Sequence, residues 1–325
     1  MNRAQGAGIA AIAIASVLWG TTGTAATFAP DAGPLAIGAA ALGIGGLLQA
    51  AVAVPALRVA RPALAEHRRT VVVGAVCVAV YPLAFYSSMH LAGVAVGTVV
   101  SLASAPLFSG LLERWVDGRR LSRWWMLAAV LGVVGSAALA TGRVEEQGTA
   151  GGTAAGVLLG LVAGVTYAVY SWAVHGLMQR GVARPAAMGA VFGGGGLLLL
   201  PVLALTGAPL VATPEAFTVA AYMALVPMFA GYLLFGVGLA RVPASTATTV
   251  TLLEPAVAAV LAVVVVAERL AWWGWVGLGV LALSLLVLAL APATTPLPPV
   301  VSGSNGVRRA GGSCSGDVQD PDLRW

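Results

Sequence analysis

The stretch TVTLLEPAVAAVLAVVVVAERL, residues 249–270, carries two glutamates in very different surroundings. Glu268 lies beside Arg269 at the edge of the apolar run, whereas Glu254 lies inside the run, immediately before Pro255. A helix needs about 20 apolar residues to cross a bilayer, and this run is long enough. An ionised carboxylate at the centre of such a helix costs about 2.5–3.5 kcal/mol, so it normally faces a cavity or a partner. The stretch therefore predicts a membrane-spanning helix that carries a functional acid.

The rest of the chain has the same apolar character. Of its 325 residues, 59% are hydrophobic and 9% are charged, compared with roughly 25% charged in soluble proteins. The mean hydropathy is +0.93. We therefore expect an all-α integral membrane protein with ten transmembrane helices. The ten apolar runs lie at about 7–28, 35–56, 70–91, 94–114, 124–141, 152–174, 186–206, 216–239, 244–267 and 271–291.

The charge distribution predicts the orientation. The net charge of +5 comes from arginine alone, since the chain contains no lysine. With the N-terminus inside, only Arg143 and Arg269 lie in outer loops, a strong positive-inside bias. We expect a multi-pass protein of the inner (cytoplasmic) membrane with both termini in the cytoplasm. Residues 1–29 also resemble a secretory signal, but the repeat described next requires them in the mature chain. Dispersed arginines without a nucleic-acid-binding motif argue against a nucleic-acid partner.

An internal repeat relates the two halves of the chain. When residues 101–125 are placed above 250–274, Pro106 falls on Pro255, and an Arg-Leu-x-x-Trp pattern recurs in the same register. This predicts two five-helix repeats, at 1–141 and 142–291. Because five is odd, the second copy must enter the membrane from the opposite side, as in the inverted repeats of secondary transporters. Residues 292–325 are rich in Pro, Gly and Ser and predict a disordered cytoplasmic tail.

These motifs resemble those of a known transporter family. The chain contains LEP at 253–255, about a dozen apolar residues, ERL at 268–270 and a last apolar helix, and it has a Trp19-Gly20 pair near its start. This combination is similar to the EamA-type branch of the drug/metabolite transporter superfamily. The resemblance covers about 7–291. It implies a ten-helix inner-membrane transporter that moves small metabolites or drugs, often by export. The first half departs from the pattern, with SAP at 104–106 and GRRL at 118–121.

The candidate site centres on Glu254. Burial favours the protonated form of a carboxyl group, which suits a proton-coupled carrier, and a single central acid also suits one cationic or amine group. The alternative is a carboxyl that only hydrogen-bonds a neighbouring helix. Pro255 and Pro106 should each kink their helices and free carbonyls to line a cavity, although such kinks can also serve packing alone. Ser104 lies beside Ala105, the residue that corresponds to Glu254 in the first half.

Aromatic and hydroxyl side chains complete the predicted path. They can bind an amphiphilic solute without burying a charge, although Tyr and Trp also populate membrane interfaces for structural reasons. The candidates are Trp19, Thr21, Thr22, Tyr81, Tyr86, Tyr167, Tyr170, Ser171 and Tyr232. We expect Gly156, Gly160 and Gly164 to form a close contact between helices instead.

These features favour a secondary active transporter that exports a small metabolite or drug, with protons as the coupling ion. A chain without lysine has no Walker A motif, so the energy must come from a gradient or from the flow of substrate itself. We expect no cofactor and no metal site, because the two cysteines and three histidines are scattered. We expect no enzymatic activity, since an intramembrane enzyme needs clustered His, Asp or Glu. A lipid or lipid-linked substrate flippase is the alternative function.

Overall fold

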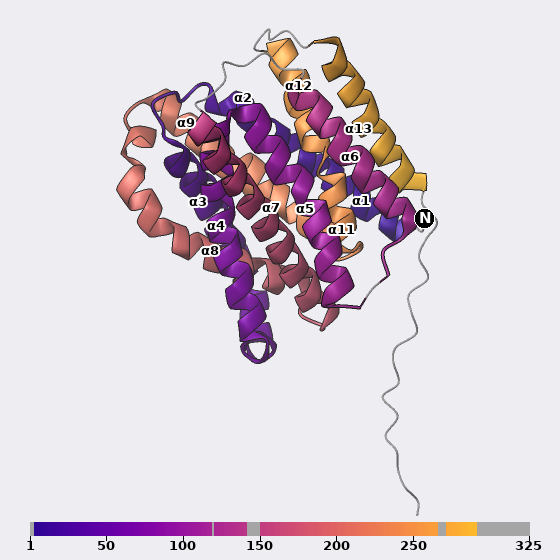
Figure 1. Cartoon of the computed structure of the whole chain (residues 1–325). Coiled ribbons are helices and arrows are strands. Elements are labelled where there is room, and N and C mark those ends of the chain that lie inside the picture. The colour runs from indigo at the N-terminus through magenta and orange to yellow at the C-terminus, as the bar shows by residue number, and fades with distance from the viewer. Residues whose placement is uncertain (1–2, 119, 142–149, 266–270, 291–325) are drawn as a thin grey trace, which may run out of the picture. The chain divides into compact units, whose positions relative to one another are not determined.

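The computed structural model describes residues 3–118, 120–141, 150–265 and 271–290, and every regular element within them is a helix (Figure 1). The predicted boundary at 141/142, the loop that holds Glu268 and Arg269, and the predicted tail lie outside these residues. The elements are α1 Arg3–Gly20, α2 Thr22–Ala26, α3 Pro34–Glu66, α4 Arg68–Ala92, α5 Val94–Trp115, α6 Arg123–Thr141, α7 Ala150–Gln179, α8 Arg184–Thr206, η1 Ala208–Val211, α9 Pro214–Met223, η2 Ala224–Ala230, α10 Gly231–Leu239, α11 Ala244–Val250, α12 Leu253–Val265 and α13 Trp272–Leu290.

The lengths and apolar character of these helices support a multi-pass membrane protein. Within the described ranges, eight helical segments are long and apolar enough to cross a membrane. They correspond to the first four and the sixth to ninth of the predicted runs. Two further apolar helices, over Arg123–Leu139 and Trp272–Leu288, are shorter and correspond to the fifth and tenth runs. The count of ten crossings therefore stays a prediction.

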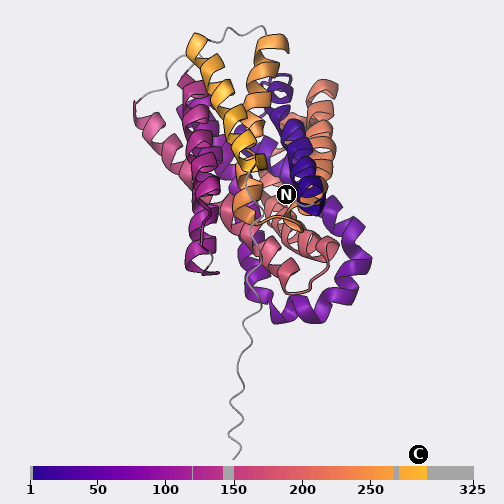
Figure 2. The same ribbon diagram turned by 90° about the vertical axis from the view of Figure 1, so that its right-hand side faces the viewer.

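The connection between the second and third runs differs from the expected loop. The pattern predicted a break from about residue 57 to 69, but α3 continues to Glu66 and α4 begins at Arg68 (Figure 2). The intervening residues are mostly Ala, Leu and Arg, which have high helix propensity, so the helix extends past the end of the apolar run. The arginines that were expected to lie in this loop therefore belong to helices.

Contacts between helices have the symmetry of a repeat. If the halves correspond in order, α3 packs on its own counterpart α8, and α6 packs on its counterpart α13. Two other large contacts come in exchanged pairs, because α4 packs on α7 as α10 packs on α1, and α5 packs on α7 as α12 packs on α1. Exchanging the halves therefore preserves these main contacts.

The counterpart helices run antiparallel. A Cβ atom added to Gly196 would lie 2.7 Å from the carbonyl oxygen of Gly43, and one added to Gly189 would lie 3.5 Å from the Cα of Ala50. Along this contact, residue numbers rise in α3 while they fall in α8, so the two helices run in opposite directions. The same holds for α6 and α13, since Ser284 Oγ donates to the Ala128 carbonyl at 2.6 Å and Gly277 lies against Leu139. An inverted repeat requires this antiparallel relation.

The glycine stripe of α7 lies in a contact between helices, as predicted. Added Cβ atoms would lie 2.7 Å from Ala92 N at Gly156, 2.9 Å from Ser88 Oγ at Gly160, and 2.8 Å from the Ser101 carbonyl oxygen at Gly164. These glycines let α7 approach α4 and α5 closely.

Three membrane segments lose regular α-helical structure. The first is interrupted at Thr21, between α1 and α2, and the eighth passes through the π-helical η2, which contains Pro227. The ninth was expected to run unbroken from 244 to 267 with a kink at Pro255, but α11 ends at Val250 and α12 begins at Leu253.

The break in the ninth segment follows from proline geometry. Pro255 has no N–H, and its ring would clash with the carbonyl of Thr251 in a continuous helix. That carbonyl instead accepts a hydrogen bond from the Glu254 amide at 2.9 Å, and the chain turns at Thr251 and Leu252. By contrast, α5 continues through Pro106 without interruption.

Candidate functional site

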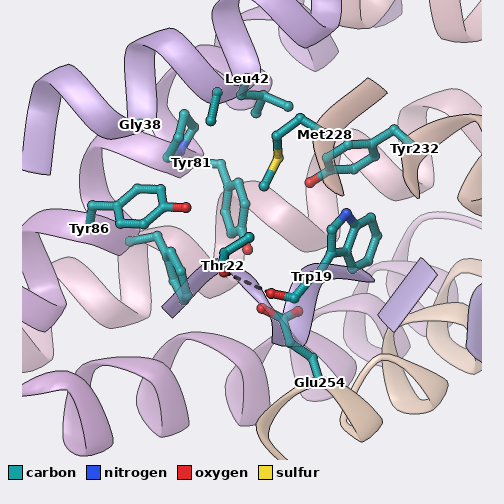
Figure 3. Close-up of a pocket in the computed structure, with 12 residues that line it drawn as sticks. Trp19, Thr22, Gly38, Leu42, Tyr81, Tyr86, Met228, Tyr232 and Glu254 are labelled. Carbon is teal, nitrogen blue, oxygen red and sulfur yellow. Dashed lines mark hydrogen bonds between the residues drawn. The ribbon is translucent and has the colours of Figure 1, made fainter. Parts of the chain in front are cut away.

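A small buried cavity lies where the three irregular segments meet (Figure 3). Its volume is about 20 Å³, which is room for about one water molecule. The side chains around it are therefore closed together in this structure. The cavity is lined by Trp19, Thr22, Gly38, Ala41, Leu42, Tyr81, Pro82, Phe85, Tyr86, Met228, Tyr232 and Glu254.

Glu254 is the only acidic residue in this lining, and it lies in the first turn of α12. It is 7% exposed, and its carboxylate has no hydrogen-bond or ion-pair partner among the described residues. Figure 3 shows the carboxylate pointing toward the cavity, below Thr22 and Trp19. The helix break at Thr251 and Leu252 therefore places an unpaired acid in a buried space.

Trp19 forms one wall of the cavity and is held from both sides. Its indole Nε1 donates to the carbonyl of Pro227, in the π-helical segment, at 2.8 Å. Thr22 Oγ1 donates to the Trp19 carbonyl at 2.7 Å, at the interruption between α1 and α2 (Figure 3). A Cβ added to Gly231 would lie 2.7 Å from Nε1, so glycine at this position lets the indole approach α10. The Trp19 side chain thus satisfies a carbonyl of the π-helical segment, while the Trp19 carbonyl is satisfied by Thr22 of its own segment.

Tyr167 and Tyr170 lie behind the cavity wall and do not line the cavity. The ring of Tyr81 packs on both, with centroid separations of 5.3 Å to Tyr167 and 5.7 Å to Tyr170. The Tyr170 hydroxyl shares a hydrogen bond of 2.8 Å with the hydroxyl of Tyr232, which does line the cavity. Ser171 is fully buried, and its hydroxyl has no hydrogen-bond partner in the described part of the chain. These residues support the wall from behind.

The two prolines and Ser104 also lie outside the lining. Ser104 Oγ donates to the Ser101 carbonyl at 3.3 Å, where α5 packs on Gly164 of α7. Pro106 is buried inside α5, and Pro255 acts only through the break that it causes before Glu254. Of the predicted residues, the structure brings together Glu254, Trp19 and Thr22 with Tyr81, Tyr86 and Tyr232.

Six of the twelve lining residues were not predicted from the sequence. Gly38, Ala41 and Leu42 come from α3, and a Cβ on Gly38 would lie 3.0 Å from the Pro82 carbonyl oxygen. Phe85 is one helical turn after Tyr81 and therefore lies on the same helix face. The spacing of these two residues in the sequence could have predicted Phe85 as a lining residue. The others resemble ordinary buried apolar residues. Within the described residues, no group of three or more His, Cys, Asp or Glu side chains is placed to hold a metal ion.

A larger groove of about 620 Å³ lies on the other side of the junction between α1 and α2. Thr21 lines this groove and the next residue, Thr22, lines the cavity. Thr21 Oγ1 shares a hydrogen bond of 2.7 Å with the hydroxyl of Tyr222 in α9. Two consecutive residues at an interrupted helix thus separate the groove from the cavity. The groove is lined by Thr21, Thr24, Ala25, Phe28, Pro214, Glu215, Thr218, Val219, Tyr222 and Leu261.

The chain is similar to known membrane transporters. The model of the EamA-like transporter family matches the chain twice, over residues 6–141 and 154–290. The uncharacterized transporter YwfM of Bacillus subtilis (strain 168) is 36% identical over 284 residues, which cover 86% of this chain and 93% of that protein. A solved crystal structure, described only as a protein, superposes with a TM-score of 0.70 at 19% identity over 86% of this chain and 95% of its own. That last likeness concerns the fold alone.

Proposed function

Because the chain belongs to the EamA-like transporter family, we propose that this membrane transporter is a secondary carrier that exports a small metabolite or drug in exchange for protons. In this proposal ten helices cross the inner membrane as two inverted repeats, with both termini in the cytoplasm. The buried cavity beside Glu254 is the substrate site in its closed state, and Glu254 is the group that takes up and releases the proton.

The observation that carries the proposal is the unpaired, buried carboxyl group of Glu254. Among the described residues, no arginine or histidine lines the cavity, and the titratable groups that line it with Glu254 are Tyr81, Tyr86 and Tyr232. A buried charge without a partner is costly, so the empty site favours a neutral carboxyl group, and loss of the proton must be compensated by a substrate. Proton and substrate occupancy are then linked at a single residue.

The groove beyond Thr21 supports a route to the cavity. Opening the Thr21–Tyr222 contact and moving α2 would join the groove to the space beside Glu254. With the N-terminus in the cytoplasm, α2 and the start of α9 lie toward the outer surface, so the groove is the outer vestibule in this proposal. Interrupted helices commonly form the substrate sites of secondary carriers, and one repeat moves against the other around such a site during transport.

The proposal is tested with the purified full chain in proteoliposomes. A comparison of media from cells with and without the protein first identifies the exported compound. Its transport driven by an imposed pH gradient is then measured for the wild type, Glu254→Gln and Glu66→Gln. Glu66 lies exposed at the end of α3 and provides a matched removal of one carboxylate.

We expect Glu254→Gln to abolish transport driven by the pH gradient, while Glu66→Gln retains it. Normal pH-dependent transport by a folded Glu254→Gln protein would overturn the role of this residue. Export that does not respond to a proton gradient in the wild type would overturn the coupling.

A further inference from the structure

Aromatic rings form a large part of the cavity beside Glu254. Five of its twelve lining residues are aromatic: Trp19, Tyr81, Phe85, Tyr86 and Tyr232. The rings also pack on one another, with centroid separations of 4.7 Å for Trp19–Tyr232, 5.6 Å for Tyr81–Phe85 and 5.3 Å for Phe85–Tyr86. Figure 3 shows Trp19, Tyr81, Tyr86 and Tyr232 around a common space with Glu254 below them. Rings placed around a central space form the type of box that binds ammonium groups through cation–π attraction.

The polar groups of this box favour a positive charge over a negative one. The donor of Trp19 is already used by the Pro227 carbonyl, and the hydroxyl of Tyr232 is paired with Tyr170. No described lining residue carries a positive charge that could bind a carboxylate or phosphate. The hydroxyls of Tyr81 and Tyr86 could each donate a hydrogen bond to an anion, but the anion would still face Glu254 and the negative faces of the rings without an opposite charge. A cation would find one opposite charge and several ring faces.

We propose that the transported solute is an organic cation with a single positive charge and no carboxylate, whose ammonium head is seated between Glu254 and the aromatic box. The inference rests on the proposed function, since it names the substrate class of the same site. It excludes zwitterions such as free amino acids as preferred substrates, because their carboxylate meets no positive charge among the described lining residues and lies near Glu254. The cavity is too small for any such head group in the closed state, so binding requires the side chains to move apart.

Three probes of nearly equal shape separate charge from size. Choline carries the trimethylammonium head, 3,3-dimethylbutan-1-ol is its uncharged isostere, and glycine betaine adds a carboxylate to the same head. Binding of each is measured by calorimetry on the full chain in detergent, with phenyltrimethylammonium and tert-butylbenzene as a larger pair. We expect at least one cation of the series to bind at least about tenfold more tightly than its uncharged isostere, and choline to bind more tightly than betaine.

Two variants test where the cation sits. Glu254→Gln should weaken cation binding by about 30-fold or more, as expected for loss of a buried opposite charge. Phe85→Leu should weaken it by about 2- to 30-fold, the usual range for one cation–π contact, with a smaller effect on the isosteres. Phe85 is 5% exposed, and the matched control Phe217→Leu changes a ring that is 60% exposed on α9.

Equal or tighter binding of betaine or of the uncharged isosteres would overturn the inference, as would a cation affinity unchanged by both Glu254→Gln and Phe85→Leu. An exported compound that is anionic or zwitterionic, moved in a Glu254-dependent exchange with protons, would also overturn it while leaving the proposed function intact. Binding of cations without any proton exchange would have the reverse effect: the substrate class would stand and the proposed coupling would fail.

Discussion

Glu113 of α5 accepts two hydrogen bonds from Ser245 of α11, one from the backbone amide at 2.9 Å and one from the hydroxyl at 2.7 Å. Glu113 is buried, with 4% of its surface exposed. Ser245 is the second residue of α11, so its amide is one of the four that a helix N-terminus leaves without an internal partner. A carboxylate from one helix therefore caps another, and the two helices correspond to each other in the repeat.

We expect Glu113→Ala to lower the free energy of unfolding by about 1–3 kcal/mol, because it leaves the buried Ser245 amide without its acceptor. Ser245→Ala should have a smaller effect, since it removes only the hydroxyl and keeps the amide bond. Unfolding of the detergent-solubilised protein, followed by circular dichroism, measures both. Equal losses for the two variants would show that the amide contact does not dominate.

The contact between α6 and α13 can be tested with two glycines on one helix. A Cβ on Gly277 would lie 2.6 Å from the Leu139 amide nitrogen and 2.8 Å from the Gly135 carbonyl oxygen, whereas one on Gly279 would meet nothing within 4 Å. Gly277→Ala should therefore destabilise the protein by about 1–3 kcal/mol. Gly279→Ala should stabilise it by up to about 1 kcal/mol through helix propensity. Thermal unfolding of each variant in detergent, followed by circular dichroism, measures the two effects. Indistinguishable melting temperatures of the two variants would contradict this packing.

The apolar pattern was sufficient to predict where membrane-spanning helices lie, because a run of about 20 apolar residues has few other ways to avoid water. It failed between residues 57 and 69, where hydropathy falls but helix propensity stays high. It also missed Glu113, because an acid beside Arg114 near the end of a span has the pattern of an interfacial residue. Only the position of α11 shows that Glu113 is buried.

The candidate site was predictable only in part, and for a physical reason. Glu254 is conspicuous because an acid inside an apolar run is costly, and aromatic or hydroxyl residues such as Trp19 and Thr22 are conspicuous for similar reasons. Gly38 and Met228 belong to the same lining, yet in the sequence they do not differ from other packing residues. The helix break before Glu254 was also missed, since Pro255 alone predicts a kink and does not show where the freed carbonyl finds its donor.

The hydrogen bond from Trp19 to the Pro227 carbonyl predicts a specific loss of stability. Trp19→Phe keeps a ring in the wall but leaves a buried carbonyl without its donor, which should cost about 1–3 kcal/mol. Trp172 provides the control, because its indole Nε1 donates to the Asp117 carboxylate at an exposed position, at 3.1 Å to Oδ2. Trp172→Phe should change the free energy of unfolding by less than about 1 kcal/mol, since water can replace an exposed partner. A larger loss for Trp172→Phe than for Trp19→Phe would contradict this account of the cavity wall.

Two neighbouring residues of α7 should respond in opposite directions when their hydroxyl groups are removed. The hydroxyl of Tyr170 is paired with that of Tyr232, whereas the hydroxyl of Ser171 has no partner among the described residues. Tyr170→Phe leaves the Tyr232 hydroxyl buried and unpaired, so we expect a loss of about 1–2 kcal/mol in the free energy of unfolding. Ser171→Ala removes a group that was desolvated without compensation, so stability should stay the same or rise slightly. Unfolding in one detergent compares both variants with the wild type. A clear loss in Ser171→Ala would show that its hydroxyl binds a partner, such as an ordered water, which holds it in the folded state.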